Sequence, residues 1–175
     1  MTSSTNKRSA VYAGSFDPPT NGHLWMIQKA STLFDDLTIA VGLNPEKKTT
    51  FSVEERVQML EEIVKEFKGV SVTILDQKFL VNYAKDIHAP YVIRGIRSAA
   101  DYEYERIMRY INSDLQPDIS TIFLMPPREF AEVSSTMVKG MIGPEGWQEV
   151  IKKYLPETVY KKMIQYAENE LNLFA

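Results

Sequence analysis

Short apolar runs rich in β-branched residues alternate with stretches of helical periodicity along the first two thirds of the chain. The runs cover residues 10–14, 37–43, 70–75, 91–95 and 120–125, and each has the length of a strand. Because each run is close to continuously apolar, we expect five buried strands.

The connections between these runs carry helical signatures. Apolar residues recur at helical spacing from Val53 to Phe67, and Ser52 with Glu55 forms a capping box ahead of them. The same spacing extends from Tyr104 to Leu115, between the fourth and fifth runs. A strand, a helix and a strand in succession require parallel pairing with right-handed crossovers. The pattern therefore predicts an α/β fold, a doubly wound, mainly parallel five-stranded sheet with helices on both faces.

From Ser135 onward the pattern is helical. After Pro156 one stripe carries Val159, Met163, Ala167, Leu171 and Phe174. Such a stripe is typical of packing against a core or another subunit rather than of a cofactor site. We expect one domain over residues 1–175, with a core of about 9–139 and a C-terminal helical extension of about 140–175.

Composition narrows the classes of protein. The chain has 175 residues, 44% of them hydrophobic, which is enough for one domain with a sizeable core. A net charge of -3 gives no overall basic surface, so we expect no nucleic-acid partner. The absence of cysteine excludes disulfides and thiolate metal sites. No apolar stretch approaches the roughly 20 residues that span a bilayer, and the N-terminus does not resemble a signal peptide, so we expect a cytoplasmic protein without a membrane partner.

Polar segments follow four of the predicted strands, at residues 14–23, 44–48, 94–105 and 125–136. The carboxyl ends of parallel strands meet at one edge, where α/β sheets bind their ligands. Cationic and hydroxyl side chains gathered there, on a chain of negative net charge, predict an anion site, of which a polyphosphate site is the simplest form. The candidates are Ser15, His23, Lys47, Lys48, Arg94, Arg97, Arg128, Ser134, Ser135 and Thr136.

The first of these segments, GSFDPPTNGH, matches neither a P-loop nor a dinucleotide fingerprint. Gly22 allows a close approach of the backbone to a ligand, and His23 lies at the start of a predicted helix, where free N–H groups face an anion. A histidine there can also serve only to cap the helix. The helix N-terminus lowers the pKa of His23 and a bound polyphosphate raises it, so the two effects oppose each other.

Four blocks of the chain, YAGSFDPPTNGH, the KK of NPEKKTTFSVEER, IRGIRSAADYEYE and FLMPPREFAEVSSTMVK, resemble those of bacterial phosphopantetheine adenylyltransferases in order and spacing. These enzymes belong to the nucleotidylyltransferase superfamily with its [HT]-x-G-H signature, and the similarity runs from about Ser9 to Lys139. The resemblance implies a Rossmann-like fold and transfer of the adenylyl group of ATP to 4'-phosphopantetheine, giving dephospho-coenzyme A and pyrophosphate. It also implies Mg²⁺ that arrives with ATP, no metal held by protein ligands, and a homohexamer.

The same resemblance assigns roles to residues. His23 is implied to stabilise the transition state at the α-phosphate, with Ser15, Lys47 and Arg94 completing the catalytic set, and Ser15 stands where the family usually has threonine. The implied ATP-binding residues are Ser15, Phe16, His23, Gly95, Ile96, Arg97, Glu105, Phe130, Ser134, Ser135 and Thr136. The implied acceptor-binding residues are Ser15, Lys47, Leu80, Arg94 and Glu105.

Plainer interpretations stay open beside these roles. Arg94 can form a salt bridge with Asp101 or Glu105, Leu80 can belong to the core, and Ser134 to Thr136 can serve as N-cap residues. Three other functions also compete. These are adenylyl transfer to nicotinate mononucleotide, cytidylyl transfer to glycerol 3-phosphate, and nucleotide binding without catalysis.

Overall fold

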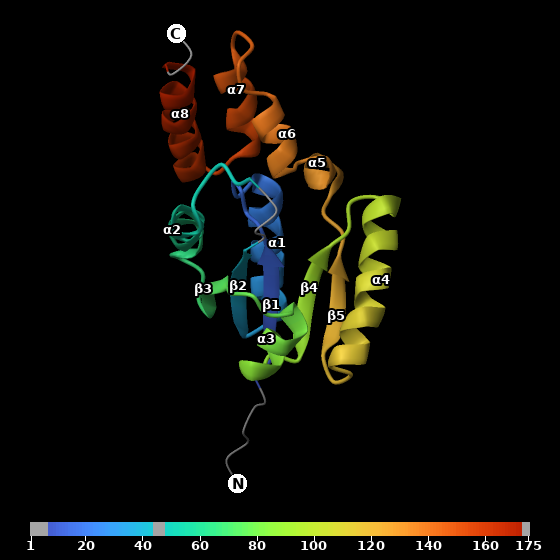
Figure 1. Cartoon of the computed structure of the whole chain (residues 1–175). Coiled ribbons are helices and arrows are strands. Elements are labelled where there is room, and N and C mark those ends of the chain that lie inside the picture. The colour runs from blue at the N-terminus through green and yellow to red at the C-terminus, as the bar shows by residue number, and fades with distance from the viewer. Residues whose placement is uncertain (1–6, 44–47, 173–175) are drawn as a thin grey trace.

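A parallel five-stranded sheet forms the centre of the computed structural model, which describes residues 7–43 and 48–172 (Figure 1). The strands lie in the order β3-β2-β1-β4-β5, and every neighbouring pair is parallel. This confirms the predicted fold class. The strands are β1 (Ser9–Gly14), β2 (Asp36–Gly42), β3 (Val70–Leu75), β4 (Tyr91–Gly95) and β5 (Ser120–Leu124).

Helices connect the strands and cover both faces of the sheet. The predicted helices after the second and fourth strands are present, as is the helix that begins beside His23. The helices are α1 (Asn21–Leu33), α2 (Val53–Val64), α3 (Leu80–Asp86), α4 (Ala99–Leu115), α5 (Arg128–Ala131), α6 (Ser135–Gly140), α7 (Trp147–Ile151) and α8 (Glu157–Asn172), with a 3₁₀ turn η1 (Lys152–Tyr154).

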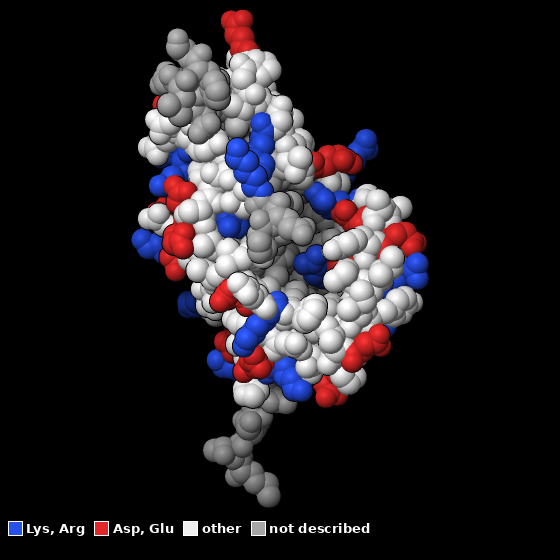
Figure 2. All heavy atoms as spheres, in the orientation of Figure 1, with Lys and Arg blue, Asp and Glu red and all other residues white. Residues whose placement is uncertain are grey.

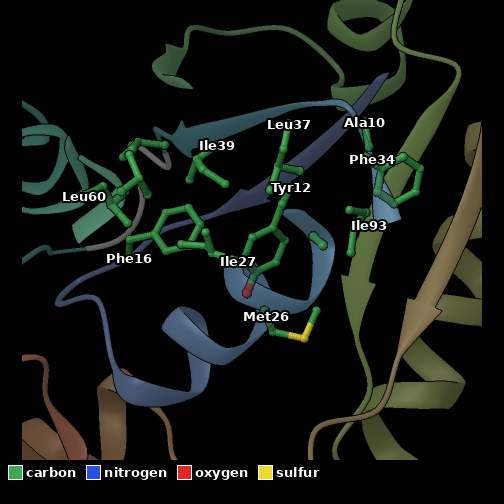
Figure 3. Close-up of a cluster of buried hydrophobic side chains, with 13 residues drawn as sticks. Ala10, Tyr12, Phe16, Met26, Ile27, Phe34, Leu37, Ile39, Leu60 and Ile93 are labelled. Atoms are coloured by element: carbon green, nitrogen blue, oxygen red, sulfur yellow. The ribbon is translucent and has the colours of Figure 1, made fainter. Parts of the chain in front are cut away.

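Alternate residues of β1 divide the core between the two faces. Ala10 and Tyr12 pack in a cluster with α1 and α2, whose members include Ile27 and Leu60 (Figure 3). Val11 and Ala13 pack on the other face, against α3. The period of two along a strand explains the division. It fixes β1 from both sides, so the loop that follows β1 starts from a rigid base.

The two outer strands differ from expectation. The prediction of buried strands holds for β1 and β2 and for the centre of β4, but it is wrong for β3 and β5, whose residues are partly buried or exposed. Ile74 in β3, for example, is 38% exposed. An edge strand has a neighbour on one side only, which the apolar content of a short run does not reveal.

Helix α4 also differs from an ordinary core-facing helix. Its apolar residues have the spacing that predicted the helix, yet Tyr104, Ile107 and Ile111 are 60%, 53% and 43% exposed. The helix lies at the periphery beside β5 (Figure 1). Periodicity therefore predicted the helix correctly, but in the single chain much of its apolar stripe lies at the surface.

The C-terminal helices close a second core beyond the carboxyl ends of the strands (Figure 1). Val159, Met163 and Ala167 of α8 are buried there, as the stripe predicted, together with Trp147 and Ile151 of α7. The cluster also takes in Phe51 and Met59, from the start and the middle of the α2 region. The extension is thus packed onto the segment that leads into α2. Within the described residues, no helix is both long and apolar enough to cross a membrane.

Candidate active site

A cavity of about 440 Å³ lies at the carboxyl ends of β1, β4 and β5. The strand order reverses between β1 and β4, where α/β sheets bind ligands. Figure 2 shows the surface hollowed there, between the end of the sheet and α4. The residues that line the cavity are Tyr12, Ala13, Gly14, Ser15, Gly22, His23, Met26, Arg94, Gly95, Arg97, Ala100, Asp101, Tyr104, Glu105, Pro126, Phe130, Val133, Ser134, Ser135 and Thr136.

The start of α1 holds His23 in one orientation. Thr20 is the N-cap, and its side chain accepts a hydrogen bond from the backbone N–H of His23. In return, the backbone N–H of Thr20 donates to Nδ1 of His23 at 3.0 Å. Histidine thus takes the place that glutamate or glutamine holds in an ordinary capping box. The capping role and the site role foreseen for His23 coincide.

This hydrogen bond determines the tautomer. A backbone N–H can only donate, so Nδ1 must accept, and the ring proton lies on Nε2. Burial, with a smaller contribution from the charge of Arg97, lowers the pKa of His23 to about 4. Burial is thus the main cause of the lowered pKa, while the opposing effects of the helix N-terminus and of a bound polyphosphate stay predictions. At neutral pH His23 is an uncharged imidazole whose Nε2–H is a hydrogen-bond donor.

The loop between β1 and α1 presents Ser15 and hides Phe16. Ser15 lines the cavity, whereas the Phe16 side chain is fully buried and packs edge-on against His23 with ring centroids 5.0 Å apart. Phe16 has φ of 48°, a backbone conformation that residues other than glycine rarely adopt. The Phe16 ring packs against the imidazole and does not line the cavity, and the implied role of Phe16 in ATP binding stays a prediction.

Arg94 and Glu105 form an ion pair on the cavity wall. Arg94 Nε donates to Glu105 Oε1 at 2.9 Å, and the side chains are 28% and 9% exposed. Burial opposes the charge of Arg94, but the hydrogen bond and the charge of Glu105 outweigh it and raise the pKa of the guanidinium. The salt bridge that competed with an anion-binding role is therefore present. Both residues nevertheless line the cavity, so a substrate anion can reach the same guanidinium.

Arg97 forms a second, more exposed pair. Its Nε donates to Asp101 Oδ2 at 3.0 Å, and its backbone N–H donates to the same oxygen at 3.1 Å. The two side chains are 39% and 28% exposed. The cavity thus has two guanidinium groups on one side, each neutralised by a carboxylate of α4.

The segment after β5 completes the cavity beside the start of α1. Ser134 is the N-cap of α6 and accepts from the backbone N–H of Met137, as the N-cap interpretation predicted. Ser135 Oγ donates to the carbonyl of Pro18 at 2.8 Å, which ties this segment to the loop after β1. A side chain at Gly22 would place its Cβ 3.3 Å from the carbonyl oxygen of Val133. Gly22 therefore allows the start of α1 to approach this segment closely.

Several predicted site residues are not found among the residues that line the cavity. Lys47 lies outside the described residues. Lys48 is exposed, and neither it nor Arg128 lines the cavity. Leu80 packs at the edge of the core cluster under α3, as its plainer interpretation held. Ile96 lines a neighbouring apolar cavity of about 310 Å³ rather than this one.

Three charged residues behind the cavity were missed from the sequence. Asp17 and Arg56 are 4% and 2% exposed, and Lys139 donates to Asp17 Oδ2 at 2.8 Å. Arg56 Nη1 donates to the carbonyl of Ser15 at 2.7 Å. A signal for Arg56 was available, because at three residues after Val53 it falls on the apolar stripe of its helix. Asp17 and Lys139 are distant in sequence, so no local pattern joins them.

Among the described residues, no group of three or more histidine, cysteine, aspartate or glutamate side chains is placed to hold a metal ion. Glu105 and Asp101, the carboxylates that line the cavity, are engaged with Arg94 and Arg97. A cation here would thus depend chiefly on ligands that a substrate brings.

A family model and several known proteins are similar to this chain in sequence. The cytidylyltransferase-like family model matches residues 11–141. A phosphopantetheine adenylyltransferase of Chromobacterium violaceum is 64% identical, covering 92% of this chain and 99% of its own length. Those of Neisseria meningitidis and Caldanaerobacter subterraneus subsp. tengcongensis are 59% and 39% identical, covering 93% and 90% of this chain and 96% of their own lengths.

Solved structures support the fold. A Plasmodium falciparum nicotinic acid mononucleotide adenylyltransferase complexed with NaAD aligns with a TM-score of 0.65 at 19% identity, over 91% of this chain and 96% of its own. A lipopolysaccharide core biosynthesis protein of Thermoplasma volcanium aligns with a TM-score of 0.52 at 15% identity, over 68% and 95%. At such identity the likeness concerns the fold alone. The family model and the sequence relatives go further, and they show that the chain belongs to the phosphopantetheine adenylyltransferase family.

Proposed function

We propose that this protein transfers the adenylyl group of ATP to 4'-phosphopantetheine, giving dephospho-coenzyme A and pyrophosphate. The observation that carries the proposal is one cavity lined by a neutral Nε2–H donor of His23, the guanidinium groups of Arg94 and Arg97, and the hydroxyls of Ser15, Ser134 and Thr136. Donors from separate segments around one cavity suit a reaction between two phosphate-bearing molecules. The relatives' names support the same substrate pair.

The reaction needs positioning more than proton transfer. An oxygen of the acceptor phosphate attacks the α-phosphorus of ATP, the bond from that phosphorus to the bridging oxygen breaks, and pyrophosphate leaves with the electron pair. The attacking phosphate is already an anion at neutral pH, so no strong general base is required. In agreement with this, His23 Nδ1 contacts Thr20 and no carboxylate among the described residues.

His23 and the arginines then have separate tasks. His23 Nε2–H donates to an oxygen on the α-phosphorus, where charge builds as the bond forms. Arg94, at the end of β4, orients the acceptor phosphate, while Arg97 neutralises phosphate oxygens of ATP. By resemblance, we place Lys47 in contact with the transferring phosphates. Mg²⁺ comes with the ATP phosphates, since the described residues offer no cluster of ligands for it, and it neutralises their charge when bound.

A panel of acceptors tests the proposal. Purified protein with MgATP is given 4'-phosphopantetheine, nicotinate mononucleotide or glycerol 3-phosphate, and pyrophosphate release is measured; CTP replaces ATP in a parallel set. We expect rapid release only with ATP and 4'-phosphopantetheine. Release with nicotinate mononucleotide or with CTP would reassign the substrate within the fold, and release with none would leave a nucleotide-binding protein without this activity.

We also propose that the protein acts in the cytoplasm as a homo-oligomer, a hexamer as the resemblance implies. Support for assembly comes from the exposed apolar residues of α4, beside an edge strand that has no neighbour within the described chain. Light scattering after gel filtration tests the assembly, with Ile107→Glu as the disrupting variant because Ile107 is 53% exposed and does not line the cavity. A wild-type monomer would contradict this part of the proposal.

A further inference from the structure

The Asp17 carboxylate joins three segments that meet behind the cavity. It follows Phe16 in the loop after β1 and is buried, with a side chain that is 6% exposed. Its Oδ1 accepts from the backbone N–H of Phe51 at 2.9 Å and its Oδ2 from that of Thr50 at 3.0 Å. Lys139 of α6 donates to Oδ2 at 2.8 Å. One carboxylate thus ties the loop after β1 to the residues that lead into α2 and to the helix after the Ser134 N-cap.

None of the groups in this junction belongs to the cavity lining. The loop after β1 does carry a site residue, because Ser15, which lines the cavity, lies two positions before Asp17. Lys139 lies four positions after Ser135, which lines the cavity and donates to the carbonyl of Pro18. The ion pair therefore joins segments that carry cavity-lining residues, although neither Asp17 nor Lys139 lines the cavity itself.

The charges in the junction are balanced. Burial by itself raises the pKa of Asp17, but the hydrogen bond from Lys139 and those from Thr50 and Phe51 outweigh it and lower the pKa below its ordinary value. The lysine is partly buried, with a side chain that is 31% exposed. Removing the charge of Lys139 leaves a buried carboxylate whose remaining hydrogen bonds come from the backbone N–H groups of Thr50 and Phe51, with Arg56 as a neighbouring cation that does not hydrogen-bond to it, and this weakens the hold on all three segments.

We propose that the Asp17–Lys139 ion pair is a positioning element of the active site, which sets the loop after β1, the segment before α2 and helix α6 in the arrangement needed for adenylyl transfer. Lys139 and Asp17 are positioning residues that act through Ser15 and Ser135. The inference rests on the proposed adenylyl transfer, and it adds two residues to which no role could be assigned from the sequence.

The test compares Lys139→Met with Lys139→Arg and with a control. Lys7 pairs with Asp36 at 3.2 Å near the amino end of β2, at the opposite edge of the sheet, with side chains 70% and 43% exposed. Lys7→Met therefore removes a lysine–aspartate pair without touching the junction. For each variant, kcat, the KM for each substrate, the Kd of ATP and the melting temperature are measured.

We expect Lys139→Met to lower kcat by about 10- to 100-fold, the scale of a misplacement near 1 Å, with a smaller change in ATP affinity. Lys139→Arg should restore most of the lost kcat, and Lys7→Met should retain wild-type values. In a double-mutant cycle, the variant with both Lys139→Met and Asp17→Asn should have a kcat no lower than that of the worse single variant, because both substitutions break the same ion pair. If Lys139→Met does not fold, Lys139→Gln takes its place in the same comparison.

Two results would overturn the inference. One is a folded Lys139→Met protein with wild-type kcat. The other is a loss of kcat with a different origin. Such an origin is shown if the loss only matches the loss of folded protein, if Lys7→Met has the same loss, or if the losses of Lys139→Met and Asp17→Asn multiply in the double variant. Amide exchange at Thr50 and Phe51 provides a readout independent of activity; it should accelerate in Lys139→Met and in Asp17→Asn but not in Lys7→Met. If wild-type protein releases no pyrophosphate, the proposed function fails, while unchanged exchange at these amides refutes the positioning role by itself.

Discussion

The cavity has two walls of different construction. The inner wall, made of Ser15, Gly22 and His23, follows β1, whose residues are packed on both faces of the sheet. The outer wall, made of Arg94 and Arg97 with their carboxylate partners on α4, is held by ion pairs and borders a helix with an exposed apolar face. The inner wall is neutral and preorganised, whereas the outer wall is charged and internally compensated.

The difference separates two physical tasks. A donor that stabilises a transition state should not need to reorganise during the reaction, and the Thr20 cap together with the Phe16 ring holds His23 in place. A group that binds a phosphate needs free donors, and each guanidinium has five N–H groups, of which its carboxylate partner uses only some. The inner wall is thus suited to rate and the outer wall to binding.

The largest expected effect comes from breaking the inner wall. His23→Ala should lower kcat by about 10²- to 10³-fold, the loss of about 2.7 to 4 kcal/mol seen when one oxyanion donor is removed. Most of the ATP affinity should remain, because the arginines and the hydroxyls are intact. Steady-state kinetics and calorimetric titration with ATP measure the two quantities. A variant with near-normal kcat would remove His23 from the mechanism.

The next effect comes from the buried pair of the outer wall. Arg94→Met removes a charged hydrogen bond to the acceptor, so kcat/KM for 4'-phosphopantetheine should fall about 10- to 100-fold, from about 1.5 to 3 kcal/mol. The variant should also melt at a lower temperature, since Glu105 is 9% exposed and loses its partner. Adding Glu105→Gln should recover the melting temperature but not the acceptor affinity. Recovery of both would show that Arg94 acts only as the partner of Glu105.

Acid should lower the free energy of unfolding over a defined pH range, because His23 becomes protonated there. Burial lowers the pKa of His23 from an ordinary 6.5 to about 4, so the unfolded chain binds the proton first. Stability from this residue is complete above about pH 6.5 and declines as the pH falls towards 4, by on the order of 1–2 kcal/mol for a partly exposed ring. Urea unfolding of wild type and His23→Gln at several pH values measures this contribution of His23 to the free energy of unfolding. Equal pH slopes in the two proteins would contradict the lowered pKa.

The smallest effect belongs to the exposed pair. Arg97→Met should change the free energy of unfolding by less than about 1 kcal/mol, because surface ion pairs contribute little. Its kcat/KM for ATP should fall while that for the acceptor is preserved, which is the reverse of the Arg94→Met pattern. Thermal unfolding and kinetics with each substrate varied in turn distinguish the two arginines. If both variants lose kcat/KM for the same substrate, the two arginines do not have separate roles.

The sequence predicted the framework well because strands and crossovers leave local periodic signals. The runs 70–75 and 91–95 match β3 and β4 residue for residue, and the polar segments after β1, β4 and β5 do converge on one cavity. Burial of the outer strands and of α4 was predicted less well, because a run of apolar residues does not specify how many neighbours it has.

The site was predictable only where one segment carries the chemistry. His23 follows from its helix start, and Arg94 from its place at the end of an apolar strand. The tautomer of His23 depends on the position of the Thr20 amide, and the burial of Phe16 depends on its backbone angle. The Asp17–Lys139 pair spans 122 positions, so only the folded chain brings it together.

The most direct test of the account is nitrogen NMR of the His23 ring during addition of ATP. His88→Asn removes the other histidine at an exposed position whose φ of 56° asparagine tolerates. With ¹⁵N-labelled histidine at pH 7, we predict a neutral ring protonated on Nε2, which keeps that tautomer and shifts its Nε2–H resonance as ATP binds. A ring that is protonated on Nδ1, or one that does not respond to saturating ATP, would contradict the account.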